Sequence, residues 1–336
     1  MGREGGRSKD AGKPGIKEVA AVAGVSPTTV SRVLNNRGYI SQETRDKVHA
    51  AMERVNYAPN DIARAMLNGR LNLIGMIVPF VSSPFHAQVV QAVERTLAKN
   101  GFKMLLCNSA NRPDRERSYI EMLRRNMVDG VIVNSLNIGA EAYAEMGLSL
   151  VGIDCDLGEG SVQIASDSYS IGELATRRLI DDGCTRILCL RNNSRMRMPG
   201  NKRSEAYCDV VAEAGMPALV REIEFVKPDD EKGAAVTQIL KENPDIDGIF
   251  AGDDTMAAIC LNVMRQRGLR APEDIKVVGA DGARRTMTFM PDLTTVRQDI
   301  DRIGELAAQS IIALVNGEQP ESNIKLPVEL IEGKTA

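Results

Sequence analysis

The stretch IKEVAAVAGVSPTTVSRVLNN, residues 16–36, predicts two short helices joined by a tight turn. The first helix is indicated by three apolar residues at helical spacing, Val19, Ala20 and Ala23. Gly24 is suited to end that helix, Ser26 to cap the next one, and Pro27 to occupy the first position of the second helix. Helices connected by so short a loop must pack closely, as in a helix-turn-helix unit.

The second helix, residues 27–34, has one apolar and one polar face. The apolar face consists of Val30, Val33 and Leu34, and the polar face of Thr28, Thr29, Ser31 and Arg32. Small hydroxyls and one arginine suit base edges in a DNA major groove. A third helix is expected behind Ser41, where Val48, Ala51, Met52 and Val55 can close a miniature core. Periodicity alone leaves open an ordinary three-helix bundle with a solvated polar face.

From Leu71 onward the pattern changes to apolar strands alternating with amphipathic helices. The segments LIGMIVP, KMLLCNS and DGVIVNS are separated by helical stretches, and a second series follows LSLVGID. This order predicts parallel sheets, since parallel strands need helical crossovers. The expected fold is a small all-α head followed by an α/β core of two doubly wound subdomains.

Charge and composition favour a DNA-binding head on an acidic body. Residues 1–70 contain twelve Lys or Arg against seven Asp or Glu, a balance of +5, whereas the rest contains thirty against thirty-eight, a balance of −8. Such a chain should approach DNA with one end only, and salt should weaken the binding. With 336 residues and 43% hydrophobic residues, there is room for two or three domains with packed cores.

Targeting signals and reactive cysteine pairs are not apparent. No apolar run approaches the ~20 residues of a transmembrane helix. Residues 1–15, MGREGGRSKDAGKPG, have no hydrophobic centre, so we expect a flexible arm and a cytoplasmic protein. The six cysteines lack the spacing of metal ligands and are expected to be reduced and mostly buried. Neither a metal nor a cofactor is predicted.

The sequences of three motifs closely resemble those of the LacI/GalR family of bacterial transcription regulators. The resemblance extends over nearly the whole chain. These motifs are VAGVSPTTVSRVLNN, the exit NYAPN at residues 56–60, and IARAMLNGRLNLIGMIVP at residues 62–79. The resemblance implies a helix-turn-helix head, a hinge, and a periplasmic-binding-protein-like core with an effector site between its subdomains. It also implies a homodimer that binds a pseudo-palindromic operator.

The resemblance implies roles for the head residues. Pro27, Thr28 and Arg32 match base-reading positions, and the DNA backbone contacts would come from Ser26, Thr29, Ser31, Asn35 and Tyr39. Proline has no side-chain donor and threonine only a hydroxyl and a methyl group. Arg32 is therefore the best candidate for a bidentate contact to guanine. The alternative role of Arg32 is a phosphate contact.

The hinge helix would begin near Asn60 and end before Gly69. About eight residues are too few for a lone helix to persist in water, so ordering on DNA is expected. In the family a leucine of each hinge enters the minor groove. Here Met66 stands at that position and Leu67 follows it, and either side chain could act as the apolar wedge. Alternatively, both only pack the two hinges together.

The expected domain boundaries follow from the pattern and the resemblance. The arm spans 1–15, the head 16–59, and the hinge and linker 60–70. The core spans 71–336. Within it, the N-subdomain is expected at about 71–165 and 296–322, and the C-subdomain at about 166–295 and 323–333, with crossovers near residues 166, 296 and 323.

Effector residues are expected where strands end, because open α/β sheets bind ligands at the carboxyl ends of their strands. Asp154 ends LSLVGID, Asp253 follows GIFAG, and Asp281 follows VVGA. Phe85 and His86 follow the first strand. Aspartates after strands also commonly cap the next helix, which is the alternative for Asp253 and its neighbour Asp254. His86 could likewise be part of a helix turn without a ligand.

By resemblance, Arg203 matches the arginine before the aromatic residue of the long second-subdomain helix, and Asp281 matches the acid after the strand VVG. Arg197 matches a position used for anionic effectors in purine-sensing members. An arginine and an aspartate can together bind ligand hydroxyls. A low aromatic content and a cluster of basic residues favour an acidic effector, such as a sugar acid or sugar phosphate, over a neutral sugar. The members of this cluster are Arg191, Arg195, Arg197, Lys202 and Arg203.

The sequence therefore predicts a dimeric DNA-binding regulator, a repressor, that responds to a small carbohydrate-like effector. Induction and corepression both remain open. Two other classes share the α/β core, a nucleotide-cofactor enzyme and a solute-binding protein of a transporter. The enzyme is disfavoured because no GxGxxG follows a strand and only His49 and His86 are present. The solute-binding protein would need a signal peptide and no DNA-binding head.

Overall fold

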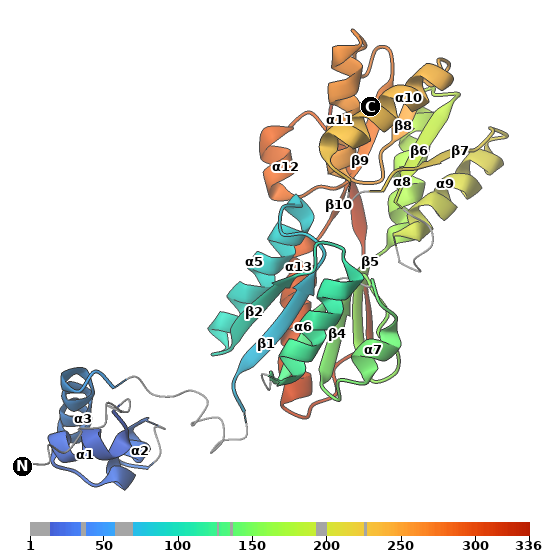
Figure 1. Cartoon of the computed structure of the whole chain (residues 1–336). Helices are drawn as coiled ribbons and strands as arrows, with labels where there is room; N and C mark the ends of the chain where they lie inside the picture. The colour runs from blue at the N-terminus through green and yellow to red at the C-terminus, as the bar shows by residue number, and fades with distance from the viewer. Residues whose placement is uncertain are drawn as a thin grey trace, which may run out of the picture. The chain divides into compact units, whose positions relative to one another are not determined.

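The computed structural model describes residues 14–34, 38–57, 70–125, 128–134, 137–192, 200–224 and 227–336. The chain divides into two compact units, residues 1–71 and 72–336 (Figure 1). Asn35, Met66, Leu67 and Arg197 lie outside the described residues, as does most of the expected hinge.

The described residues of the first unit contain the helices α1 (Ile16–Ala23), α2 (Pro27–Leu34) and α3 (Gln42–Arg54). Gly24 ends α1 in the left-handed conformation, with φ 67°. The Ser41 side chain caps α3 by accepting a hydrogen bond from the Thr44 amide. The predicted core is confirmed: its buried residues are Val19, Ala20, Val30, Val33, Val48 and Ala51, and Ala23, Leu34, Met52 and Val55 pack against them.

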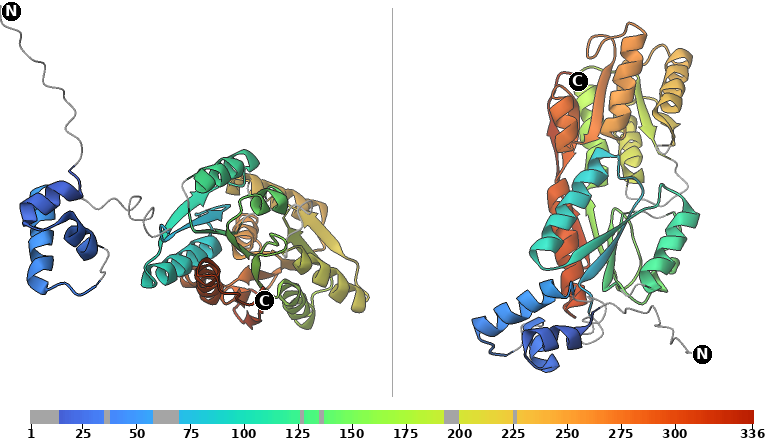
Figure 2. Two further views of the ribbon diagram at one scale, coloured as in Figure 1. Left: turned by 90° about the horizontal axis from the view of Figure 1, so that it is seen from below. Right: turned by 60° about the vertical axis from the view of Figure 1, so that its left-hand side comes forward.

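The second unit contains two lobes, each built on a six-stranded sheet (Figures 1 and 2). The first sheet has the order β11-β5-β4-β3-β1-β2, and all of its strands are parallel. Its strands are β1 (Leu73–Val78), β2 (Lys103–Asn108), β3 (Gly130–Val133), β4 (Ser149–Ile153), β5 (Val162–Ser166) and β11 (Asn323–Leu326). The helices of this lobe are α5 (Pro84–Lys99), α6 (Pro113–Arg125), α7 (Ala140–Ala144) and α13 (Ile300–Val315).

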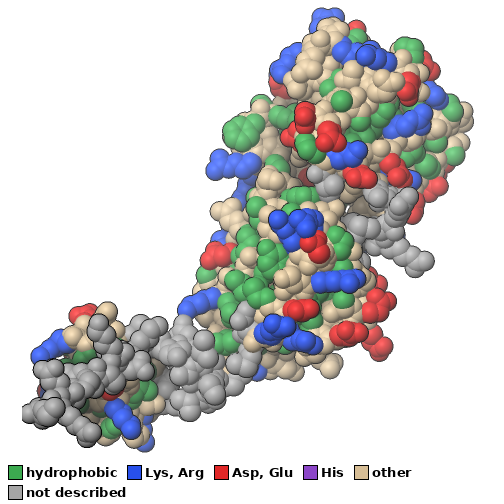
Figure 3. Space-filling view, viewed as in Figure 1, with side chains coloured by type: hydrophobic (Ala, Val, Ile, Leu, Met, Phe, Trp, Pro, Cys, Tyr) green, Lys and Arg blue, Asp and Glu red, His purple; other side chains and the backbone are tan. Residues whose placement is uncertain are grey.

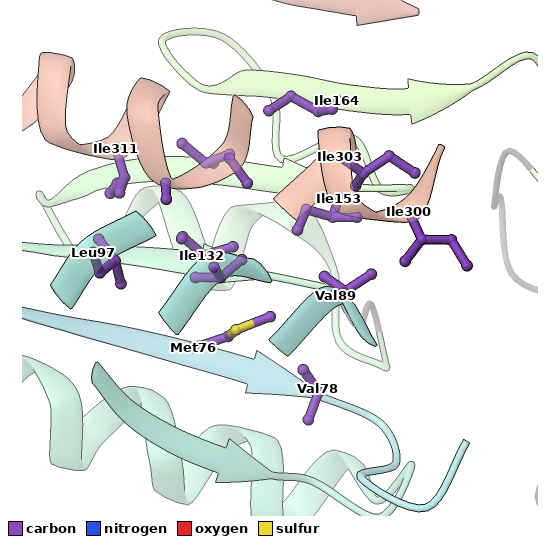
Figure 4. Close-up of a cluster of buried hydrophobic side chains, with 14 of the residues drawn as sticks. Met76, Val78, Val89, Leu97, Ile132, Ile153, Ile164, Ile300, Ile303 and Ile311 are labelled. Atoms are coloured by element: carbon purple, nitrogen blue, oxygen red, sulfur yellow. The ribbon is translucent and has the colours of Figure 1, made fainter. Parts of the chain in front are cut away.

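Alternation of side chains along these strands places helices on both faces of the first sheet. Figure 4 shows one of the two resulting cores, where α5 and α13 pack against the sheet. The core in this view includes Met76, Val89, Ile132, Ile153 and Ile303. A second core, on the other face, joins the sheet to α6 and α7.

The second sheet has the order β12-β10-β9-β8-β6-β7, with only β12 antiparallel to its neighbour. Its strands are β6 (Ile187–Arg191), β7 (Leu219–Glu222), β8 (Gly248–Phe250), β9 (Lys276–Asp281), β10 (Thr294–Gln298) and β12 (Val328–Ile331). The helices are α8 (Ser168–Asp181), α9 (Asn201–Glu213), α10 (Asp229–Glu242), α11 (Asp254–Gln266) and α12 (Arg284–Phe289). The α10 and α11 helices cover one face of the sheet, and α8 and α9 the other.

The chain crosses between the lobes at Asp167, Asp299 and Pro327. The predicted boundary near 296 is too early, since Val296 pairs with Ala280 of the second sheet and β10 continues to Gln298. The boundary near 323 is also too early, because Ile324 pairs with Ile164 of the first sheet. Residues 296–298 therefore belong to the second lobe and residues 323–326 to the first. Backbone pairing across the sheet decides where these short strands end.

One loop of the second lobe is seated against the first lobe. Ala283, between β9 and α12, is 1% exposed and belongs to the hydrophobic core of the first lobe. The Arg284 amide donates a hydrogen bond to Gln88 Oε1 of α5, at 2.9 Å. The Arg284 guanidinium also bonds Asp301 of α13, at 3.2 Å. This loop begins one residue after Asp281.

The cysteines agree with the prediction: all six are free, and all except Cys208 are buried. Among the described residues, no helix is both long and apolar enough to cross a membrane. The described part of the chain also holds no group of three or more His, Cys, Asp or Glu arranged to bind a metal ion.

Candidate functional site

The first candidate surface is the polar face of α2. Ser26 caps this helix, because its Oγ accepts a hydrogen bond from the Thr29 amide at 3.0 Å. Val30 and Val33 are buried on the inner face, which fixes the rotation of the helix. Pro27, Thr28 and Arg32 are consequently exposed. Among the described residues, the Arg32 side chain forms no ion pair, so its guanidinium is available to a partner.

The predicted backbone-contact residues lie in α2 or close to its ends: Ser26 precedes the helix, Thr29 and Ser31 are part of it, and Tyr39 follows it. Ser26 and Tyr39 are exposed, and Thr29 and Ser31 are half-buried. The Tyr39 side chain stands out with 99% of its surface exposed. A tyrosine this exposed contributes nothing to the core of the head, which is consistent with a contact to a partner. Asn35 lies outside the described residues.

The second candidate site lies where the two lobes meet. The chain leaves the first lobe after β5 and re-enters it after β10, so the carboxyl ends of both strands lie at the crossovers. Because neighbouring strands are parallel, the other strands end at the same edges. Of the predicted acids, Asp154 follows β4, Asp253 follows β8, and Asp281 is the last residue of β9.

Arg203 of α9 is the centre of this polar cluster, which we define as His86, Asn134, Asp154, Ser166, Arg203, Asp253, Asp281 and Gln298. The Arg203 guanidinium donates to the Gly252 carbonyl at 2.6 Å and lies 3.5 Å from Asp281 Oδ1. Gln298 Nε2 donates to the same Asp281 oxygen at 2.7 Å. The side chains of Arg203 and Asp281 are 16% and 15% exposed, so their charges are poorly screened.

Burial raises the pKa values of the acids in the cluster. It raises the pKa of Asp154 to about 6, while the nearby charge of Arg203 opposes the rise. Burial also raises the pKa of Asp281 well above its usual value, again opposed by Arg203. Asp154 has a left-handed backbone, with φ 51°, directly after β4. The single Arg203 guanidinium thus acts on acids from both sheets.

The two adjacent aspartates after β8 have different roles. Asp253 Oδ1 accepts a hydrogen bond from the Met256 amide at 2.7 Å, so Asp253 caps α11. Asp254 is buried and accepts from the Thr295 hydroxyl and the Gly282 amide. Burial raises the pKa of Asp254 to about 7. Asp254 therefore fixes the loop after β9. The capping alternative for Asp253 is observed, although its carboxylate remains beside Arg203.

Phe85 and His86 lie in the first turn of α5. Phe85 is buried in the core of the first lobe, and its ring meets the His86 ring edge-on at 5.3 Å. Phe85 therefore supports His86 from the core. The Nδ1 atom of His86 is buried without a hydrogen-bond partner among the described residues, and burial lowers its pKa to about 4. A neutral imidazole is thus held at the end of β1.

Further members of the cluster were not predicted from the sequence. Asn134 follows β3, Ser166 ends β5 and Gln298 ends β10. Each has a buried oxygen without a hydrogen-bond partner in the described part of the chain, as has Asp154. Buried polar groups without partners are rare in folded proteins. Their concentration at the strand ends indicates that a polar ligand completes their hydrogen bonds. For Asn134 and Ser166, a polar residue at the end of an apolar strand was the available signal.

The predicted basic cluster is not assembled as a charge clamp by the described residues. The Arg191 guanidinium bonds Glu222 at 2.7 Å, and Lys202 is exposed. Arg195 and Arg197 lie outside the described residues. Among the described members of this group, Arg203 is the one in contact with the predicted acids.

The head and the core together define a regulator that combines a DNA-binding surface with a site for a small polar ligand. Comparison with known families and proteins agrees. The family described as "Bacterial regulatory proteins, lacI family" matches residues 15–60. The family "Periplasmic binding proteins and sugar binding domain of LacI family" matches residues 72–334. The chain belongs to the LacI family, and it is a transcription regulator and not an enzyme.

Individual relatives resemble the chain over nearly its full length. The sucrose operon repressor of Pediococcus pentosaceus is 37% identical, over 96% of this chain and 100% of its own. A solved complex of the transcriptional regulator CelR with cellobiose is 29% identical, covers 96% of this chain and all of its own, and has a TM-score of 0.71. The Lac repressor dimer bound to operator, 23% identical over 96% of this chain and 99% of its own, shares the fold with a TM-score of 0.83.

Proposed function

We propose that this protein is a cytoplasmic, dimeric repressor that binds a pseudo-palindromic DNA operator and responds to a small carbohydrate-like effector. The observation that carries the DNA-binding part is the exposed polar face of α2, held in place by a hydrophobic core on its other side. One head would occupy each half-site. The relatives named as operon repressors, and a relative solved on its operator, support this assignment.

Within each head, Pro27, Thr28 and Arg32 are proposed to face the bases. Ser26, Thr29, Ser31, Asn35 and Tyr39 are proposed to contact the DNA backbone. Arg32 carries most of the expected base discrimination, because only its guanidinium can donate two hydrogen bonds to guanine. Met66 and Leu67 of the hinge are proposed to enter the minor groove as apolar wedges.

Replacing Arg32 with alanine is expected to weaken operator binding by about 1–3 kcal/mol per half-site and to remove discrimination at one base pair. Lysine at the same position retains the charge but cannot form the guanidinium fork. Fluorescence anisotropy on an operator selected from random DNA, with each base pair varied in turn, measures both effects. If Arg32→Lys keeps full affinity and Arg32→Ala keeps selectivity, Arg32 contacts phosphate instead.

The polar cluster is proposed to bind the effector. Asp154, Arg203, Asp253 and Asp281 would bind its hydroxyl groups, His86 would donate or accept a further hydrogen bond, and Phe85 would support His86. Arg197 remains a proposed contact for an anionic group. The unpartnered buried oxygens of Asn134, Asp154 and Gln298 are the observation that supports a hydroxyl-rich ligand. The binding of cellobiose by one relative is consistent with this chemistry.

The proposed dimer needs a surface that a second copy can cover. Phe289 of α12 is 77% exposed, and Leu106 of the edge strand β2 and Val81 after β1 are 39% and 44% exposed. In Figure 3, hydrophobic side chains gather on the side of the first lobe that carries α5 and β2. An exposed aromatic of this size is typical of an interface anchor.

Replacing Phe289 with serine is expected to weaken the dimer by about 2 kcal/mol per copy, or roughly 1000-fold in dissociation constant when both copies of a two-fold interface change. Sedimentation equilibrium measures this directly. Tyr169→Ser, at another exposed aromatic of the core, is the matched control and should leave the dimer intact. Equal dissociation constants for the parent protein and Phe289→Ser would exclude this surface.

A further inference from the structure

Asp254, the first residue of α11, carries a buried carboxylate that is not part of the polar cluster. The residue is 3% exposed, and both of its carboxylate oxygens accept hydrogen bonds from neutral groups. Oδ1 accepts from the Thr295 hydroxyl at 2.6 Å, and Oδ2 accepts from the Gly282 amide at 2.8 Å. Among the described residues, no lysine or arginine forms an ion pair with Asp254. Since burial of a carboxylate without a paired cation is costly, stability alone does not explain this residue.

The second sheet leaves room for the Asp254 carboxylate. Gly279 of β9 pairs with Thr295 of β10. A Cβ atom at Gly279 would collide with Asp254 Oδ1, so the carboxylate occupies the space of a side chain at that position. Gly282 follows β9 directly. The carboxylate therefore lies along the last residues of β9 and holds both β10 and the loop after β9.

The backbone at the end of β9 has an unusual conformation. Asp281 has φ 110° and Gly282 has φ 60°. Positive φ is uncommon for residues other than glycine, and such a backbone persists only where the surrounding structure holds it. The Gly282 amide belongs to the peptide group that follows Asp281. Its hydrogen bond to Asp254 therefore fixes the backbone next to Asp281.

Asp281 needs a fixed backbone because its carboxylate has two partners in the polar cluster. Asp281 Oδ1 accepts a hydrogen bond from Gln298 Nε2 at 2.7 Å and lies 3.5 Å from the Arg203 guanidinium. A change of the backbone angles at Asp281 would move its side chain relative to both partners. Binding residues keep their geometry only when neighbouring residues support them. Asp254 gives this support through the Gly282 amide.

We propose that Asp254 is a positioning residue of the effector site, which holds the peptide group after Asp281 so that the Asp281 carboxylate faces the effector. This inference rests on the proposed function of the polar cluster. Asp254 acts through Gly282 and does not touch the effector itself. The fold retains a costly buried carboxylate because that carboxylate orients a neighbouring binding group.

Two substitutions that remove the charge of Asp254 separate positioning from a role of the charge itself. Alanine leaves the Gly282 amide without an acceptor. Asparagine can turn its carbonyl oxygen toward the Gly282 amide and donate its NH₂ group to the Thr295 hydroxyl oxygen, so it retains the bond to Gly282. Thr295→Val is the matched control, since it removes the other hydrogen bond of Asp254 and leaves the one from Gly282.

Hydrogen exchange of the amides at residues 281–284, followed by mass spectrometry, measures the effect in the full-length, ligand-free protein. Burial raises the pKa of Asp254 to about 7, so the measurement is made at pH 8, where the carboxylate is ionised. Loss of one buried hydrogen bond should speed exchange by about tenfold in Asp254→Ala. Asp254→Asn and Thr295→Val should exchange as the parent protein does. Parent-like exchange in Asp254→Ala, or equally fast exchange in Asp254→Ala and Asp254→Asn, would overturn the proposal.

Gly279→Ala is the second variant if Asp254→Ala does not fold. It keeps both hydrogen-bonding partners of Asp254 but displaces the carboxylate, because the new Cβ would collide with Oδ1. Its contacts with Ala257 and Leu293, both at 3.4 Å, are ordinary. Exchange at residues 281–284 should therefore be faster in Gly279→Ala, and unchanged exchange would contradict the proposal.

A separate binding measurement distinguishes this inference from the proposed function. Thermal shifts with sucrose, ribose and cellobiose test whether the polar cluster binds sugars. For a sugar that binds, Asp254→Ala should raise the dissociation constant about tenfold, and Asp254→Asn less than about threefold. Equal affinities of Asp254→Ala and the parent protein would exclude a positioning role at the effector site. If none of the three sugars shifts the parent protein, the proposed effector class fails, whereas hydrogen exchange still decides whether Asp254 holds the loop after β9.

Discussion

Replacement of Arg203 with methionine should lower the free energy of unfolding by about 3 kcal/mol at pH 8 and abolish the response to effector. Removing one partner of a buried ion pair leaves the other charge uncompensated. Here the remaining charges are Asp281, Asp253 and Asp154, which lie beside the Arg203 guanidinium. Methionine retains the apolar stem, so the loss reports mainly the charge.

The pH dependence of this effect has a defined sign. The folded-state pKa values of Asp154 and Asp281 already lie above those of ordinary aspartates, so these groups oppose folding as the pH rises through them. Loss of Arg203 raises these pKa values further. The destabilisation by Arg203→Met should therefore be small at pH 5, where the acids are protonated, and large at pH 8.

Urea unfolding at the two pH values measures the difference, and operator binding with and without effector measures the functional loss. Arg191→Met is the matched control, because Arg191 is a half-exposed arginine of the same lobe that pairs with Glu222. It should cost less than 1 kcal/mol at either pH. A loss for Arg203→Met that does not vary with pH would mean that the neighbouring acids do not change their ionisation between pH 5 and pH 8.

Substitution of Gly172 by alanine should destabilise the second lobe by about 1–3 kcal/mol and displace Arg203. Gly172 lies in the middle of α8, where alanine would ordinarily stabilise the helix. However, a Cβ atom there would lie 2.0 Å from the carbonyl oxygen of Arg203 and 2.9 Å from its Cα atom. These are backbone atoms, so α8 and α9 must separate, and overpacking of this kind is destabilising.

Gly233→Ala is the matched control for Gly172→Ala. Gly233 also lies inside a helix of the second lobe, but the new Cβ would make only an ordinary contact, 3.7 Å from Val263. This variant should gain about 0.5–1 kcal/mol. Urea unfolding measures the change in the free energy of unfolding for each variant, and the two changes should have opposite signs. Effector binding should be lost only in Gly172→Ala. Equal stabilisation by the two substitutions would show that α8 and α9 are not held in close contact.

The head could be predicted almost completely from its sequence, because its structure is decided locally. Gly24 ends α1 because glycine readily adopts a left-handed backbone, and the Ser41 hydroxyl caps α3. The apolar residues of the head repeat at helical spacing. The ends of β10 and β11 could not be predicted in the same way. Those strands are only five and four residues long, and their limits depend on pairing with β9 and β5, which come from distant parts of the chain.

The site could be predicted only where a residue follows a strong apolar strand or matches a motif. Asp154, Asp253 and Asp281 meet the first condition and Arg203 the second. Gln298 was not found because β10 is short and contains polar residues.

The seating of Ala283 in the first lobe has a consequence for how the two lobes can move. Rotation about the three crossovers alone is not possible, since it must also withdraw Ala283 from a closely packed core and break the bonds of Arg284 to Gln88 and Asp301. Packed interiors do not deform continuously. The lobes should therefore have discrete resting positions, and an effector bound at Asp281, two residues from Ala283, would act as a switch between them rather than adjust the angle gradually.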